Sequence, residues 1–173
     1  MSLSLYDVSV GSYLQILNAA SGFLAKGREH LEKNGVDLKD MVETKLIADM
    51  LPFRFQVVSV AHHSLGAVRA LETGIFTPPS YDPSLDYAAL EKVVAEARAG
   101  IEQYSREAID SAAEKDVVFK LGERSMPFVG ANFILSFSLP NFYFHAATAY
   151  DILRSKGVPI GKRDFMGVPR IKR

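Results

Sequence analysis

The hydrophobic positions of this chain recur mostly at every third or fourth residue, in four long segments. This spacing is typical of amphipathic helices packed against a shared core. The four predicted helices cover residues 6–33, 52–72, 84–113 and 138–156. Pro52 suits the first turn of the second helix, and Ser84 and Ser138 are the expected N-caps of the third and fourth. A short connecting helix over residues 37–49, capped by Asp37, is expected between the first two.

The segments between the helices are short or rich in turn residues. Residues 77–83 contain three prolines and predict a rigid, non-helical linker. Residues 116–120 and 124–128 predict a small hairpin around Gly122, and residues 158–173 predict an extended or frayed tail. The fold class expected is therefore all-α, a four-helix bundle with a small hairpin before its last helix. A length of 173 residues fits one domain spanning residues 1–173.

Charge and cysteine content exclude several classes of function. Twenty Lys and Arg balance twenty Asp and Glu, so the chain lacks the basic excess that nucleic-acid binders carry, and no nucleic-acid partner is expected. A near-zero net charge favours self-association. The absence of cysteine excludes disulfides, thiolate nucleophiles and cysteine-ligated zinc, and it fits a reducing compartment.

No segment has the pattern of a targeting or membrane-spanning sequence. The N-terminus lacks a basic region followed by an apolar run. The most apolar stretch, residues 128–143, is interrupted by Gly130, Asn132 and Pro140 and is too short to span a bilayer. We therefore expect a soluble, cytoplasmic protein with no membrane partner.

Four histidines are the best candidates for chemistry. His30 lies among charged residues and is expected on the surface. His62 and His63 lie in the middle of the second predicted helix, where successive side chains point 100° apart, so both flank its apolar stripe. His145 lies in the fourth predicted helix, in a segment too apolar to be exposed on all sides.

His145 shares one helix face with Asn141 and Thr148, and this polar cluster allows two interpretations. In the first, His145 is a buried structural residue that bonds Asp151, Tyr150 or a backbone carbonyl of a neighbouring helix. In the second, His145 meets one of the two histidines of the second helix, and together they bind a divalent metal such as zinc or nickel. Two histidines alone make an incomplete set of ligands.

Other patterns give little indication of function. The stretch from Gly157 to Lys162 lacks the spacing of a phosphate-binding loop, and no GxSxG motif of serine hydrolases is present. Aromatic side chains usually dominate core burial, so those near the fourth helix are expected in the core and not in a ligand site. They are Phe133, Phe137, Phe142, Tyr143 and Phe144.

The fourth predicted helix and the tail contain the strings Leu139-Pro-Asn-Phe-Tyr-Phe-His145, Thr148-Ala-Tyr-Asp-Ile-Leu-Arg154, Gly157-Val and Gly161-Lys-Arg-Asp-Phe. These strings resemble the signature of an uncharacterised domain family within the DinB-like (DinB/YfiT) superfamily. The resemblance implies a DinB-like four-helix bundle that is often a homodimer. It also implies a divalent ion held by one histidine from the second helix and an HxxxH pair from the fourth. His63 and His145 match two of these ligands, whereas Asn141 and Ala149 stand at the two positions that could complete the pair.

Two hypotheses about function follow. The protein is an enzyme, or a degenerate one, with a pocket between the second and fourth helices. There His63 and His145 bind a metal or act as acid and base, and Asn141 and Thr148 orient a small-molecule ligand. Alternatively, it is a metal-free homodimer that binds a small molecule or a partner, with structural histidines.

Overall fold

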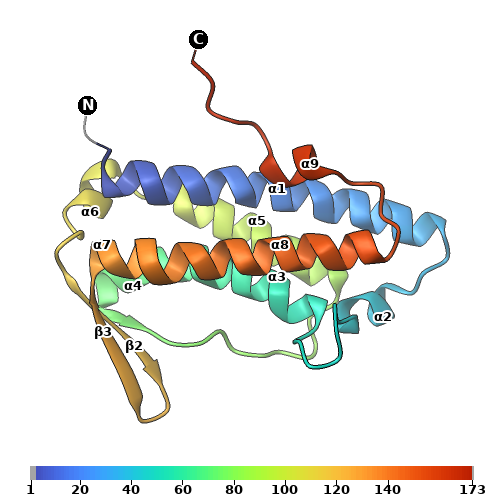
Figure 1. Ribbon diagram of the computed structural model, residues 1–173, viewed down its shortest axis with the longest axis horizontal. Coiled ribbons are helices and arrows are strands. Elements are labelled where there is room, and N and C mark those ends of the chain that lie inside the picture. Colours follow the sequence, from blue (N-terminus) through green and yellow to red (C-terminus); the bar gives the residue numbers. More distant parts are fainter. Residues whose placement is uncertain (1–2, 173) are drawn as a thin grey trace.

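Four long helical segments lie side by side in the computed structural model, which describes residues 3–172 (Figure 1). The first is α1 (Leu5–Lys33), as the hydrophobic spacing predicted to within one residue. Ser4 begins it with a capping box, in which its hydroxyl accepts the N–H of Asp7 and the carboxylate of Asp7 accepts the N–H of Ser4. This cap satisfies backbone donors that have no partner inside the helix.

The second segment contains α3 (Phe53–Ala61), the π-helical turn η1 (His62–Gly66) and α4 (Ala67–Thr73). It confirms the helix predicted after Pro52, and Gly74 ends it in the left-handed conformation with φ of 73°. The π-helical turn in its middle was not predicted.

The connecting helix α2 (Leu38–Glu43) is capped by Asp37 as expected, but the prediction of a helix to residue 49 is wrong. Thr44 is extended, and its carbonyl accepts the N–H of Phe53 across the following loop. That contact across the loop replaces a further helical turn.

The third predicted helix is wrong in two details. It begins at Asp86, not Ser84, because the Asp86 carboxylate accepts the N–H of Ala89 at 2.8 Å, while Ser84 bonds the side chain of Asp82. It is also interrupted, giving α5 (Tyr87–Ile101) and α6 (Arg106–Asp110). Ser105 caps α6 and so starts a new helix after the break.

The fourth segment starts earlier than predicted. It consists of α7 (Gly130–Asn132), the π-helical turn η2 (Phe133–Ser138) and α8 (Leu139–Ser155). Ser138 is therefore not an N-cap: it lies inside the segment, fully buried, and its side chain bonds other parts of the bundle. Pro140 suggested a helix start because proline favours the first turn, yet here the helix continues through the turn before it.

A small sheet at one end of the bundle makes the all-α prediction wrong in the strict sense. The predicted hairpin is confirmed as β2 (Asp116–Leu121) and β3 (Arg124–Val129), with Gly122 at a positive φ of 58° in its turn. The unpredicted strand β1 (Ile75–Phe76) pairs in parallel with β2, in the order β1-β2-β3. Pairing starts where Val118 donates its N–H to the carbonyl of Gly74, directly after α4.

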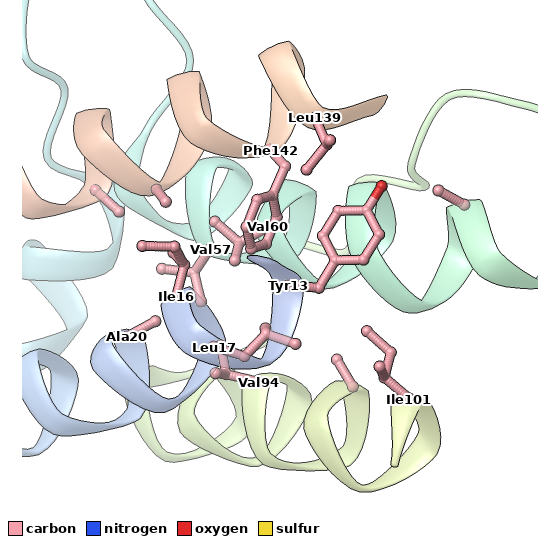
Figure 2. Close-up of a cluster of buried hydrophobic side chains, with 14 of the residues drawn as sticks. Tyr13, Ile16, Leu17, Ala20, Val57, Val60, Val94, Ile101, Leu139 and Phe142 are labelled. Carbon is pink, nitrogen blue, oxygen red and sulfur yellow. The ribbon is translucent and has the colours of Figure 1, made fainter. Parts of the chain in front are cut away.

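The core lies between the four segments, as the close-up of its central cluster shows (Figure 2). α3 packs against α5 and α8, and α1 packs against α5 and α8. The rings of Tyr13 and Phe142 meet edge to face at 5.0 Å between α1 and α8. Val57 of α3 and Val94 of α5 bring the other two segments to the same cluster, so one core is shared by all four.

The tail is more ordered than expected, because α9 (Lys162–Met166) packs on α1 (Figure 1). Asp164 pairs with Lys26, and the Gln15 amide donates to the carbonyl of Met166 at 2.8 Å. Within residues 3–172, no helix has the length and apolar character needed to cross a bilayer.

Candidate functional site

The structure places His63 and His145 against each other, although they are 82 positions apart in the chain. Their ring centroids are 5.6 Å apart and their planes are inclined by 18°. His63 lies in η1 and is only 6% exposed, whereas His145 lies in α8 and is half-buried. His62 points elsewhere: its Nε2 donates to the carbonyl of Thr77 at 2.6 Å, and its ring packs on Phe76 at 4.5 Å.

His145 is held by Gln56, a residue of α3 that is 2% exposed. His145 Nδ1 and Gln56 Oε1 are 2.8 Å apart, and Gln56 Nε2 donates to the carbonyl of Leu51 at 2.8 Å. A hydrogen-bonded His145 was one of the two interpretations of the sequence. The partner, however, is none of those expected, because the antiparallel packing of α3 on α8 brings Gln56 closer than Asp151 or Tyr150.

Both imidazoles are neutral at neutral pH. Burial lowers the pKa of His63 to about 3, and the neighbouring rings of His145 and His62 add to that effect. Burial also lowers the pKa of His145 to about 4. A charged imidazolium would lose its hydration here without gaining a carboxylate, so the uncharged form is favoured.

Aromatic rings surround the two histidines. Phe76 and Phe137 lie 5.4 Å and 6.0 Å from the ring of His63, and Phe55 and Phe144 lie 5.9 Å and 5.3 Å from that of His145. The surroundings of the imidazole pair are therefore largely apolar.

The aromatic residues expected in the core divide into two groups. Phe133 and Phe142 are buried and Phe137 is partly buried. The prediction is wrong for Tyr143 and for Phe144, which is 56% exposed, because both lie on the outward side of α8. Phe144 consequently places an exposed aromatic surface directly beside His145.

Asn141 and Thr148, the residues expected to bind a cofactor, bond to their own helix. The Asn141 amide donates to the carbonyl of Phe137, and the Thr148 hydroxyl donates to the carbonyl of Phe144, each at 2.8 Å. Such bonds to the carbonyl four residues back are common for polar side chains inside helices. The bond from Thr148 uses the only proton of its hydroxyl. Nothing else in the structure tests whether Asn141 or Thr148 contacts a ligand, so that role stays a prediction for both residues.

The donor set does not fit the three-histidine metal site that the DinB resemblance implies. Among residues 3–172, no group of three or more His, Asp or Glu side chains is arranged to hold a metal ion. His63 and His145 supply two imidazoles, and the third position carries the neutral amide of Asn141, a poor ligand for zinc or nickel. A divalent ion would also find no carboxylate there to offset its charge among the aromatic rings.

The two π-helical turns meet at this site. Ser138 of η2 donates to the carbonyl of His63 in η1 at 2.5 Å, and the hydroxyl of Tyr13, 2.6 Å away, donates to Ser138. π-helical turns are rare and occur often at functional sites. No sequence pattern predicted them, but one signal was available: Gln56, Ser59 and His63 recur at steps of three and four, which puts three polar residues on one buried helix face.

A separate hollow of about 430 Å³ lies between η1 and α5. His62, Arg69 and Glu96 contribute its polar groups, and Val58, Leu65 and Val93 contribute apolar surface. His62, which faces away from His145, is therefore the histidine that lines this hollow.

Comparison with known proteins gives a family and a fold. No protein with a curated description matches the chain. A crystal structure of a DinB family member protein from Shewanella denitrificans matches with a TM-score of 0.81 and 27% sequence identity, over 98% of this chain and 95% of that one. The model of a family described as a domain of unknown function (DUF1993) matches residues 5–166. The chain therefore belongs to this DUF1993 family and has the helical bundle of DinB-like proteins.

Proposed function

We propose that this protein is a metal-independent binding protein for a small uncharged molecule with an aromatic or apolar body and one hydrogen-bond donor. The observation that carries this proposal is the state of His145. Its ring is neutral, and its Nδ1 faces the Gln56 carbonyl oxygen, which only accepts, so Nδ1 bears the proton. Nε2 then keeps a lone pair and has no hydrogen-bond partner among residues 3–172.

A second observation concerns His63, whose Nδ1 is buried without a hydrogen-bond partner among the described residues. Such an atom raises the free energy of the folded protein by about 1–3 kcal/mol. Because this nitrogen is covered by protein, it marks an unsatisfied polar atom beside His145 and not a contact for the ligand.

The aromatic residues beside His145 favour an apolar ligand. The rings of Phe144 and Phe55 both meet the ring of His145 edge to face, and aromatic rings supply contact area to small molecules while a few polar atoms fix their orientation. Because both histidines are neutral, the site offers a carboxylate ligand no opposite charge from these rings.

The test compares phenol with anisole, which share a ring but differ in the hydroxyl donor. We expect phenol to shift the Nε2 resonance of His145 in 15N NMR and to bind roughly five- to tenfold more tightly than anisole, since one hydrogen bond separates them. His145→Ala should abolish this preference, and His30→Ala, a change at a partly exposed ring that contacts the Asn34 amide, should preserve it.

Two results would contradict the proposal. Equal binding of phenol and anisole would show that His145 does not select ligands that donate a hydrogen bond. Stoichiometric uptake of zinc or nickel, lost in both His63→Ala and His145→Ala, would show that the imidazole pair holds a metal. A homodimer remains a prediction from the near-zero charge and the DinB resemblance.

A further inference from the structure

Within residues 3–172, Gln56 is the residue whose side chain hydrogen-bonds the imidazole of His145. Both ends of its amide are engaged: Nε2 lies 2.8 Å from the carbonyl of Leu51, and Oε1 lies 2.8 Å from His145 Nδ1. A backbone carbonyl can only accept, so the nitrogen of the amide must face Leu51 and the oxygen must face His145. The orientation of the amide is thus fixed by a bond that does not involve the histidine.

We infer that Gln56 is a positioning residue that locks His145 in the Nδ1–H tautomer and thereby makes the site select ligands that donate a hydrogen bond. The ligand part of this inference rests on the function proposed above, whereas the tautomer does not. A free histidine in water prefers the opposite tautomer, with the proton on Nε2. In a protein the tautomer follows the hydrogen bond made by the other nitrogen. Without Gln56, Nε2 would carry the proton and would repel the donors that it is inferred to bind.

The geometry supports a persistent hydrogen bond between Gln56 and His145 and not a transient one. Gln56 is almost fully buried, and it lies on the helix that packs most extensively against α8. The carbonyl of Leu51 belongs to the turn that precedes α3, only five residues before Gln56, so the acceptor moves with the same helix. Rotation of the amide would place its oxygen against the carbonyl oxygen of Leu51, two acceptors facing each other, so loss of the bond to Leu51 opposes it.

The experiment measures the tautomer directly by two-bond 1H–15N NMR of His145 at pH 7.5, in the full chain without ligand. We expect a protonated Nδ1 and a bare Nε2 in the wild type. In Gln56→Met, which has an unbranched side chain of similar length with no amide, the proton should move to Nε2. Gln15→Met is the matched control, because it also removes an amide bonded to a backbone carbonyl, that of Met166, and this amide makes no bond to His145. It should leave the His145 spectrum unchanged.

Ligand binding is then measured on the same three proteins with phenol and anisole. Gln56→Met should reduce the roughly five- to tenfold preference for phenol over anisole to about equal binding, because a protonated Nε2 no longer accepts the phenol hydroxyl proton. A wild-type spectrum with the proton on Nε2, or an unchanged tautomer in Gln56→Met, would overturn the inference whether or not phenol binds. The wild-type spectrum decides the point even if the variant fails to fold. If the tautomer is as expected but phenol does not bind, Gln56 keeps its positioning role and the proposed function fails instead.

Discussion

Replacement of Ser138 by alanine tests whether the buried chain from Tyr13 through Ser138 to His63 holds the two π-helical turns together. Ser138 accepts from Tyr13 at 2.6 Å and donates to the carbonyl of His63 at 2.5 Å, and the Tyr13 side chain is fully buried. Alanine would leave the Tyr13 hydroxyl without a partner, at about 1–3 kcal/mol, and would remove one bond to His63, at about 0.5–1.5 kcal/mol. We therefore expect Ser138→Ala to lower the free energy of unfolding by roughly 2–4 kcal/mol.

Tyr13→Phe is the matched variant, because it removes the hydroxyl and leaves the bond from Ser138 to His63 in place. It should lower the free energy of unfolding by only about 1 kcal/mol. In the double variant no tyrosine hydroxyl is stranded, so the combined loss should fall short of the sum by about 1–2 kcal/mol. Urea unfolding of all four proteins gives these values. Additive losses, or a Ser138→Ala loss no larger than that of Tyr13→Phe, would refute the idea of a connected chain.

Two further predictions concern glycines and pH. Gly27→Ala should destabilise the protein by about 1–3 kcal/mol, because the new Cβ would lie 2.6 Å from the Tyr87 hydroxyl. Gly22→Ala, whose new Cβ would have no atom within 4 Å, should stabilise α1 by about 0.5–1 kcal/mol. Thermal unfolding measures both changes, and a shift of the two variants in the same direction would contradict this prediction. Between pH 6.5 and about 4, the unfolded chain binds protons at His63 and His145 that the folded protein does not. Stability should therefore fall as the pH falls, by at most about 1.4 kcal/mol per pH unit for each ring. Urea unfolding from pH 7 to 4.5 measures the slope, which should be smaller in His145→Gln; an equal slope would show that His145 does not contribute.

The helical periodicity predicted the long segments because it reports burial, which a regular helix repeats along its length. Local signals were less decisive at the ends. Ser84 and Asp86 are both residue types that cap helices. Asp86 caps α5 because its carboxylate accepts the N–H of Ala89, whereas the hydroxyl of Ser84 bonds the carboxylate of Asp82. Ser138 looked like a cap beside Pro140, but its actual partner is Tyr13, which is 125 residues away in the chain. No window of local sequence contains that contact.

The candidate site was predictable in part for the same reason. The spacing placed Asn141, His145 and Thr148 on one face, and the resemblance indicated His63, but neither could show that two of these four side chains bond to their own helix. The Gln56 bond joins residues 89 positions apart and depends on the packing of α3 on α8. A buried glutamine among apolar residues was the available signal, because an amide at such a position needs partners for both of its ends.

The packing of α9 on α1 has a consequence for synthesis of the chain. α1 is made before the three helices that pack most extensively against it, α5, α8 and α9, which all follow residue 86, and the last of them ends at Met166. At usual elongation rates of about 5–20 residues per second, α1 waits on the order of ten seconds for its last partner. Until α5 has been made, Leu17 and Phe23, fully buried in the finished fold, have none of these three helices to pack against. The first helix therefore lacks part of its cover until residue 166 has been made.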